Sequence, residues 1–126
     1  MRILVIDDSK IMQAGMKRAL VRAGHDVTLA SDGKEGLIAA RQTLPDLILL
    51  DMMLPIMSGT EVLSALKTEP STKEIPVLVL TGLSQRNEET LRKAGAAQYF
   101  EKSEHFLEHN FAALINAVGQ YSAKHL

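Results

Sequence analysis

The chain of 126 residues contains no cysteine and no tryptophan, and only three phenylalanines and two tyrosines. The lack of cysteine excludes disulfide bonds, thiolate metal sites and cysteine nucleophiles. The scarcity of aromatic side chains leaves no stacking platform for nucleic acid. Neither sign of charge predominates, because 14 basic residues stand against 15 acidic ones for a net charge of −1. We therefore expect no direct binding to nucleic acid or to an anionic membrane.

Long apolar runs are also missing. The uncharged stretch 52–57 is far shorter than the roughly 20 residues of a membrane-spanning helix. The apolar run at the start, residues 3–6, is too short for a secretory leader, which needs about 7–15 apolar residues. We therefore expect a cytoplasmic protein. A hydrophobic content of 46% still suffices for one packed core without covalent staples.

What the chain does contain is a regular alternation of strand-like and helix-like patterns. Short apolar or alternating runs are typical of strands in a sheet covered on both faces. They occur at Ile3–Ile6, Asp26–Ala30, Leu47–Leu50, Val77–Leu80 and Ala97–Phe100. Apolar residues at helical spacing predict helices over residues 10–22, 34–43, 84–93 and 104–119, and from residue 58 onward.

This alternation predicts an α/β fold, a single (βα)5 domain with a doubly wound, parallel, five-stranded sheet. We place the domain at residues 1–120 and a C-terminal tail at residues 121–126. Two capping-box patterns, Asp32 with Glu35 and Ser58 with Glu61, support the starts of two helices. Sheets of this kind bind their ligands beyond the carboxyl ends of the strands.

Polar side chains follow four of the predicted strands. Asp7 and Asp8 follow the first, Asp51 the third and Thr81 the fourth, and Lys102 lies just beyond the fifth. Three carboxylates at one edge repel one another unless a cation shares them, and Mg²⁺ is the ion that prefers such oxygen ligands. A carboxylate can also act as a nucleophile and form an acyl phosphate. Asp51, at the end of the central strand, is the candidate nucleophile, while Lys102 and Thr81 would stabilise the transferred group.

Each of these residues alone has an ordinary explanation as a turn former, a helix cap or a solvated charge. Their joint occurrence at the strand ends favours function. The set resembles the receiver domain of bacterial two-component response regulators, including the chemotaxis response regulator, over the whole chain. The resemblance rests on Asp7-Asp8, on Asp51 to Pro55 with Gly59 beyond, on Thr81-Gly82 and on Lys102. It implies a flavodoxin-like sheet with strand order 2-1-3-4-5.

The resemblance further implies a signalling role for the chain. A histidine kinase or histidine phosphotransfer protein would donate a phosphoryl group to Asp51. Mg²⁺ would be held by Asp8 and Asp51, by Asp7 largely through water, and by the main-chain carbonyl of Met53. The domain would catalyse only its own phosphorylation and a slow dephosphorylation, and would not be an enzyme acting on an external substrate.

Thr81 and Tyr99 would form the switch that carries this change to a partner. In the family, the threonine hydroxyl moves toward the phosphoryl group and the aromatic side chain turns inward. The face made by the fourth helix, fifth strand and fifth helix then changes and is read by an output protein, here unknown. A phosphorylation-dependent homodimer through that face is left open. The residues fit both a single-domain regulator and one domain of a longer chain.

Three positions depart from the family pattern. Ser103 follows Lys102 where the family usually has proline, commonly after a cis bond. A cis bond to a non-proline residue costs about 2.5–4 kcal/mol, so the usual shape of this loop is disfavoured. Met53 and Leu83 are apolar at two positions where the family varies its dephosphorylation rate. Because neither can orient an attacking water, we predict slow self-dephosphorylation.

Other interpretations fit less well. His105 to His109 matches the zinc-protease pattern H-x-x-E-H, but too little chain follows it for a further ligand and a cleft. A haloacid-dehalogenase-like phosphohydrolase would carry a second aspartate where Met53 stands. A module that kept only the fold would not need the whole set of site residues. His25 is expected in a turn without a partner.

Overall fold

The computed structural model describes residues 1–82, 88–101 and 111–124. Its strands are β1 (Arg2–Ile6), β2 (Asp26–Ala30), β3 (Leu47–Asp51), β4 (Val77–Thr81) and β5 (Gln98–Glu101). Its helices are α1 (Lys10–Arg22), α2 (Gly33–Thr43), α3 (Gly59–Thr68), α4 (Glu88–Lys93) and α6 (Ala112–Lys124).

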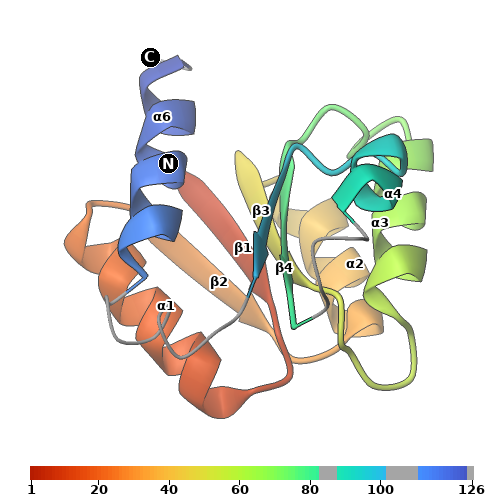
Figure 1. The fold of residues 1–126 in the computed structure, drawn as a ribbon, viewed down its shortest axis with the longest axis horizontal. Coiled ribbons are helices and arrows are strands. Elements are labelled where there is room, and N and C mark those ends of the chain that lie inside the picture. Colours follow the sequence, from red (N-terminus) through yellow and green to blue (C-terminus); the bar gives the residue numbers. More distant parts are fainter. Residues whose placement is uncertain (83–87, 102–110, 125–126) are drawn as a thin grey trace.

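The five strands form one parallel sheet in the order β2-β1-β3-β4-β5. Helices α1 and α6 cover one face of this sheet, and α2, α3 and α4 cover the other (Figure 1). The predicted α/β fold class and strand order are therefore confirmed. Among the described residues, no helix is both long and apolar enough to span a bilayer.

Alternate residues of the central strands feed two separate cores. Ile48 and Leu50 of β3 pack toward α2 and α3, whereas Leu47 and Leu49 pack toward α1 and α6. All five residues of β3 are buried, and so are all five of β4. This burial on both faces explains why these strands are continuous apolar runs in the sequence.

Helices α1, α2 and α3 begin at side-chain caps. Asp32 accepts a hydrogen bond from the Glu35 amide (2.7 Å), and Ser58 accepts one from the Glu61 amide (3.2 Å), so both predicted capping sites are confirmed. Ser9 caps α1 through the Met12 amide (3.3 Å).

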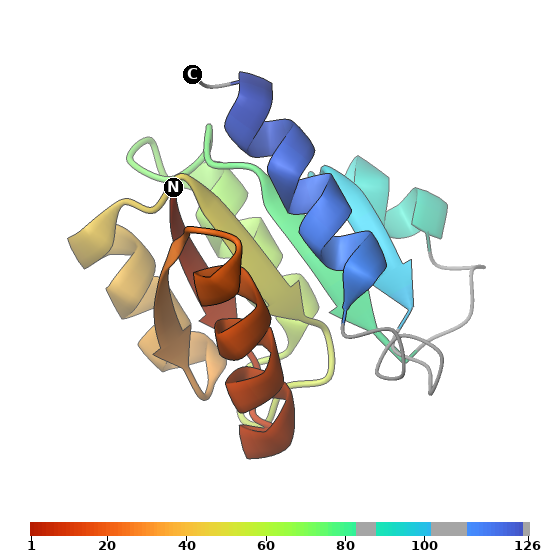
Figure 2. The ribbon, with the colours of Figure 1, turned by 90° about the vertical axis from the view of Figure 1, so that its left-hand side faces the viewer.

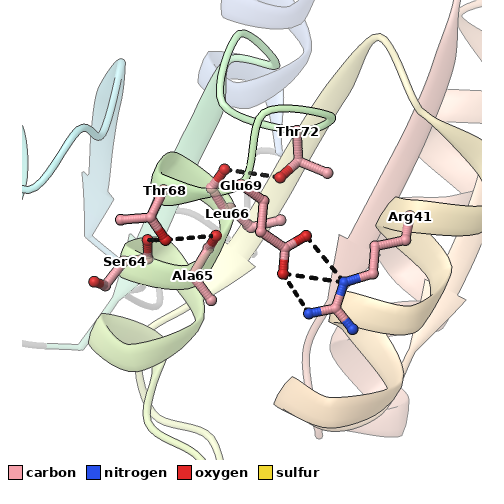
Figure 3. Close-up of polar contacts among 7 residues, drawn as sticks. All are labelled: Arg41, Ser64, Ala65, Leu66, Thr68, Glu69 and Thr72. Carbon is pink, nitrogen blue, oxygen red and sulfur yellow. Dashed lines mark hydrogen bonds and ion pairs between the residues drawn. The ribbon is translucent and has the colours of Figure 1, made fainter.

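At their C-terminal ends, α2 and α3 are tied together by an ion pair between Arg41 and Glu69 (Figure 3). The Arg41 Nε donates to both carboxylate oxygens, at 3.1 and 3.0 Å. This hydrogen bonding holds the pKa of Glu69 below its ordinary value and raises the pKa of Arg41. In the segment that follows α3, the Thr72 hydroxyl donates to the Leu66 carbonyl (2.8 Å).

The end of the chain differs from the sequence prediction. The last helix was expected to run continuously from residue 104 to about Gly119. Residues 102–110 lie outside the described part, and Phe111 has a left-handed φ of 61°, so the described helix begins at Ala112. A non-glycine residue in that region costs roughly 1–2 kcal/mol, but the conformation buries the Phe111 ring against Gly15, where an added Cβ would lie 2.8 Å from the ring.

Helix α6 continues to Lys124. The expected end near Gly119 is therefore wrong, and residues 121–124 of the predicted tail are helical. The division into a domain at 1–120 and a tail at 121–126 stays a prediction.

The prediction that His25 has no partner is wrong. The N-terminal ammonium group of Met1 donates to His25 Nδ1 at 3.1 Å. His25 is only 9% exposed, and burial, followed by the positive charge of the ammonium group, lowers its pKa.

Candidate functional site

The register of the sheet brings three aspartates to one edge. Ile6 of β1 pairs with Leu50 of β3, so the residues that follow these strands are neighbours. The arrowheads of the strands all lie toward this edge of the sheet, which we call the carboxyl edge (Figure 2). One carboxylate oxygen from each of Asp7, Asp8 and Asp51 lies within 4.8 Å of the others. We call these three residues the acid cluster.

The cluster combines two buried acids with one exposed acid. Asp7 and Asp51 are 0% and 2% exposed, whereas Asp8 is exposed. The donor set consists entirely of oxygen, which suits a hard divalent cation such as Mg²⁺ rather than a softer metal. The residues present therefore fit the predicted ion, which would offset the mutual repulsion of the three carboxylates.

Main-chain contacts set the position of Asp51. Its Oδ1 accepts a hydrogen bond from the Met53 amide at 3.0 Å, and the Met52 amide continues the β-ladder to the Leu80 carbonyl at 2.9 Å. Helix α3 begins directly behind this turn. A Cβ added to Gly59 would lie 2.4 Å from Met52 Cα and 2.7 Å from the Asp51 carbonyl oxygen. Only glycine allows α3 to approach the main chain of Asp51 and Met52 this closely.

The other predicted site residues differ in how far the structure places them. Thr81 ends β4 and is fully buried, one residue beyond the partner of Asp51 in the ladder. Tyr99 of β5 pairs with Val79 and packs against the core on the side of α2 and α3. Met53 is 60% exposed beside Asp51. Lys102 lies outside the described residues, as do Leu83, Ser103 and the histidines at 105 and 109.

The family of the chain follows from a comparison with known domains. The sequence-family model of the response regulator receiver domain matches residues 3–111 of this chain. The chain belongs to this family. The resemblance seen in the sequence is therefore confirmed, and Asp51 and the acid cluster lie within the matched region.

Two groups of proteins illustrate how far this similarity extends. Protein PilH of Pseudomonas aeruginosa is 32% identical over 118 residues, covering 93% of this chain and 96% of PilH. Response regulator PleD of Caulobacter vibrioides is 37% identical over 102 residues, which are 80% of this chain but 22% of PleD. The chain likewise spans 35% of the transcriptional regulator RpaA of a Synechocystis strain. It thus corresponds to one part of these two regulators and to nearly all of PilH.

Solved receiver domains share its fold. The chemotaxis response regulator CheY4 of Vibrio cholerae is 27% identical, with a TM-score of 0.85 over 95% of this chain and 97% of CheY4. A Mn²⁺-bound form of response regulator Rcp1 is also 27% identical, with a TM-score of 0.81 over 93% of this chain and 90% of Rcp1.

Two residues beside the acid cluster were not predicted from the sequence. Ser9 was passed over as the cap of α1, although it stands directly before the first helical residue, where a cap is expected. Gln13 lies on the buried face of α1 between Met12 and Met16. A polar residue within an apolar helical stripe is the signal that would have identified it.

Proposed function

We propose that this receiver domain is a phosphoacceptor switch, and that Asp51 takes a phosphoryl group from a histidine kinase or a histidine phosphotransfer protein. The observation that carries the proposal is the buried Asp51 carboxylate, within 4.8 Å of the carboxylates of Asp7 and Asp8, in a chain of the receiver family. Two solved relatives support it, one described as Mn²⁺-bound and one, RcpA, as phosphorylated.

Asp51 acts as the nucleophile. A carboxylate oxygen forms a bond to phosphorus as the P–N bond of the phosphohistidine breaks, and the imidazole leaves. Bound Mg²⁺ supplies positive charge that balances the phosphoryl oxygens and the acid cluster. Asp8, Asp51 and the main-chain carbonyl of Met53 would hold this ion, and Asp7 would hold it largely through water. The Met53 amide keeps the Asp51 carboxylate in place for the attack.

Thr81 and Tyr99 carry the signal away from Asp51. The Thr81 hydroxyl, at the end of the neighbouring strand, donates a hydrogen bond to the new phosphoryl group, and Lys102 pairs with its charge. Tyr99 lies on the next strand and packs against the core under α4. Its inward rotation reshapes the surface that an output protein, or a second copy of this chain, binds.

The phosphoryl donor binds over the acid cluster. Three large apolar side chains near the carboxyl edge are exposed, Ile11 of α1 by 82%, Met53 by 60% and Ile56 by 95%. They form an apolar rim on which the donor packs while its histidine reaches Asp51. We place this exchange in the cytoplasm.

Phosphorylation by a small donor tests the proposal. The wild type, Asp51→Asn and the control variant Asp46→Asn are each incubated with acetyl phosphate and Mg²⁺. The mass of each intact protein is then measured. We expect a gain of about 80 Da, one phosphoryl group, on the wild type and on Asp46→Asn but not on Asp51→Asn. Equal labelling of Asp51→Asn, or no labelling of the wild type, would overturn the proposal.

A further inference from the structure

A buried amide lies beside the acid cluster and is not used by the proposed phosphoryl transfer. Gln13 is 4% exposed on the inner face of α1, whose other buried residues are Met12, Met16 and Leu20. Burying an amide among apolar side chains is unfavourable unless it is hydrogen bonded. Its presence there therefore calls for partners.

The amide nitrogen of Gln13 has those partners at the carboxyl edge. Nε2 donates to the main-chain carbonyl of Asp7 (2.5 Å) and to the Ser31 hydroxyl (3.1 Å). The Ala30 carbonyl lies farther off at 3.4 Å. Since a primary amide has two N–H donors, the two shorter contacts account for both. Gln13 thus joins α1 to the ends of β1 and β2.

These contacts help to fix Asp7 at three atoms. Its amide donates to the Ala30 carbonyl (3.0 Å), its carbonyl accepts from Gln13, and its Oδ1 accepts from the Ser9 amide (2.9 Å). A residue held in this way cannot easily move its carboxylate away from Asp8 and Asp51, although the three charges repel.

We propose that Gln13 is a positioning residue, which holds Asp7 in place for the divalent cation of the acid cluster. The inference rests on the proposed function, because it assumes that Mg²⁺ binds there. Outer contacts that orient metal ligands before the ion arrives raise affinity, since the ion need not order the site itself. Gln13 acts through the main chain of Asp7 and does not itself contact the ion.

Replacing the amide by a thioether of similar size tests this role. Gln13→Met keeps the volume on the apolar face of α1 but removes both donors. We expect its Mg²⁺ dissociation constant, measured by calorimetry, to rise about tenfold. Gln42→Met, the same change on the exposed surface of α2, should bind Mg²⁺ as the wild type does. Met16→Ala should also bind Mg²⁺ normally, because it weakens the apolar packing of α1 and leaves the Gln13 amide in place. This variant separates lost positioning from lost stability.

A measurement on the wild type decides the question even where a variant fails to fold. In an NMR titration with Mg²⁺, the side-chain amide signals of Gln13 should shift together with the main-chain amides of Asp7 and Asp8. Those of Gln42 should stay unchanged. Wild-type affinity in a folded Gln13→Met, or an unmoved Gln13 signal at saturation, would overturn the positioning role alone. A wild type that binds no Mg²⁺ would overturn the proposed function itself, and the inference with it.

Discussion

The two edges of the sheet use charge in opposite ways. At the carboxyl edge, three acids of like sign gather at the ends of β1 and β3. At the other edge, where the strands begin, charged side chains have partners of opposite charge or main-chain partners. Arg41 contacts Glu69 between α2 and α3, and Asp46 accepts from the Arg2 main-chain amide at 2.8 Å. We call this second edge the amino edge.

This difference indicates a division of labour. The contacts of the amino edge satisfy charges and loop carbonyls. Lys67, for example, donates to the Ile75 carbonyl at 2.8 Å, although burial lowers its pKa. The carboxyl edge instead gathers three carboxylates of like charge, whose mutual repulsion a bound cation would offset. Sites that depart from local optimisation in this manner are expected to be functional. Changes at the carboxyl edge should therefore impair function and those at the amino edge stability.

The largest contrast is expected from Asp51→Asn. The change should abolish phosphoryl acceptance, but it also removes one of three crowded like charges, so the metal-free domain should become more stable by about 1 kcal/mol. Added Mg²⁺ should stabilise the wild type much more than the variant, because an ion stabilises only the state that binds it. Denaturant unfolding with and without Mg²⁺ measures both effects. A variant less stable than the metal-free wild type would show that the cluster is not strained by its charges.

A second contrast compares two glycines. Gly59→Ala places a Cβ 2.4 Å from Met52 Cα, so α3 must shift and the free energy of unfolding should fall by about 1–3 kcal/mol. Because the same turn carries Asp51, the rate of phosphorylation by acetyl phosphate should fall too. Gly119→Ala in α6 meets nothing within 4 Å and should stabilise the helix by up to about 1 kcal/mol without altering phosphorylation. Equal effects of the two substitutions would contradict the close approach of α3.

A third test concerns the lifetime of the phosphorylated state, predicted to be long because Met53 is apolar. Met53→Asn would place an amide beside Asp51 that can orient an attacking water. We expect this substitution to shorten the half-life of the aspartyl phosphate several-fold. The half-life is measured by intact mass after the donor is removed. Ile56→Asn, also at an exposed position, is the control and should leave the half-life unchanged. A wild-type half-life of seconds would refute the prediction.

Most of the fold could be predicted from the sequence, because the buried strands and capped helices carry strong local signals. The runs at 47–50 and 77–80 have no polar side chain to place in solvent, and Asp32 and Ser58 cap as their spacing indicates. The left-handed Phe111 could not be predicted, because its conformation depends on packing against Gly15 in another helix.

For the candidate site, the sequence indicated which carboxylates lie together, but not which contacts keep them in position. Asp7, Asp8 and Asp51 follow from strand order, since neighbouring parallel strands end at one edge. The contact of Gln13 with the Asp7 carbonyl depends on how α1 sits on the sheet. No sequence spacing predicts such contacts, because they depend on the tertiary structure.

The smallest effect is expected at the amino edge, from Arg41 and Glu69. Both side chains are partly exposed, 48% and 30%, so screening by solvent and salt keeps their contribution small. The pKa of Glu69 is lowered in the folded state. The pair therefore stabilises the fold above the ordinary pKa of 4.5, and this stabilisation is lost as pH falls through the folded-state pKa.

A double-mutant cycle measures the free energy of interaction between the two side chains. The free energies of unfolding of the wild type, Arg41→Gln, Glu69→Gln and the double variant are compared at pH 7 and in acid. This interaction energy should be favourable at pH 7, weaken in high salt and vanish in acid. Acetyl phosphate should still phosphorylate every variant. A variant of this pair that could not be phosphorylated would erase the distinction between the two edges.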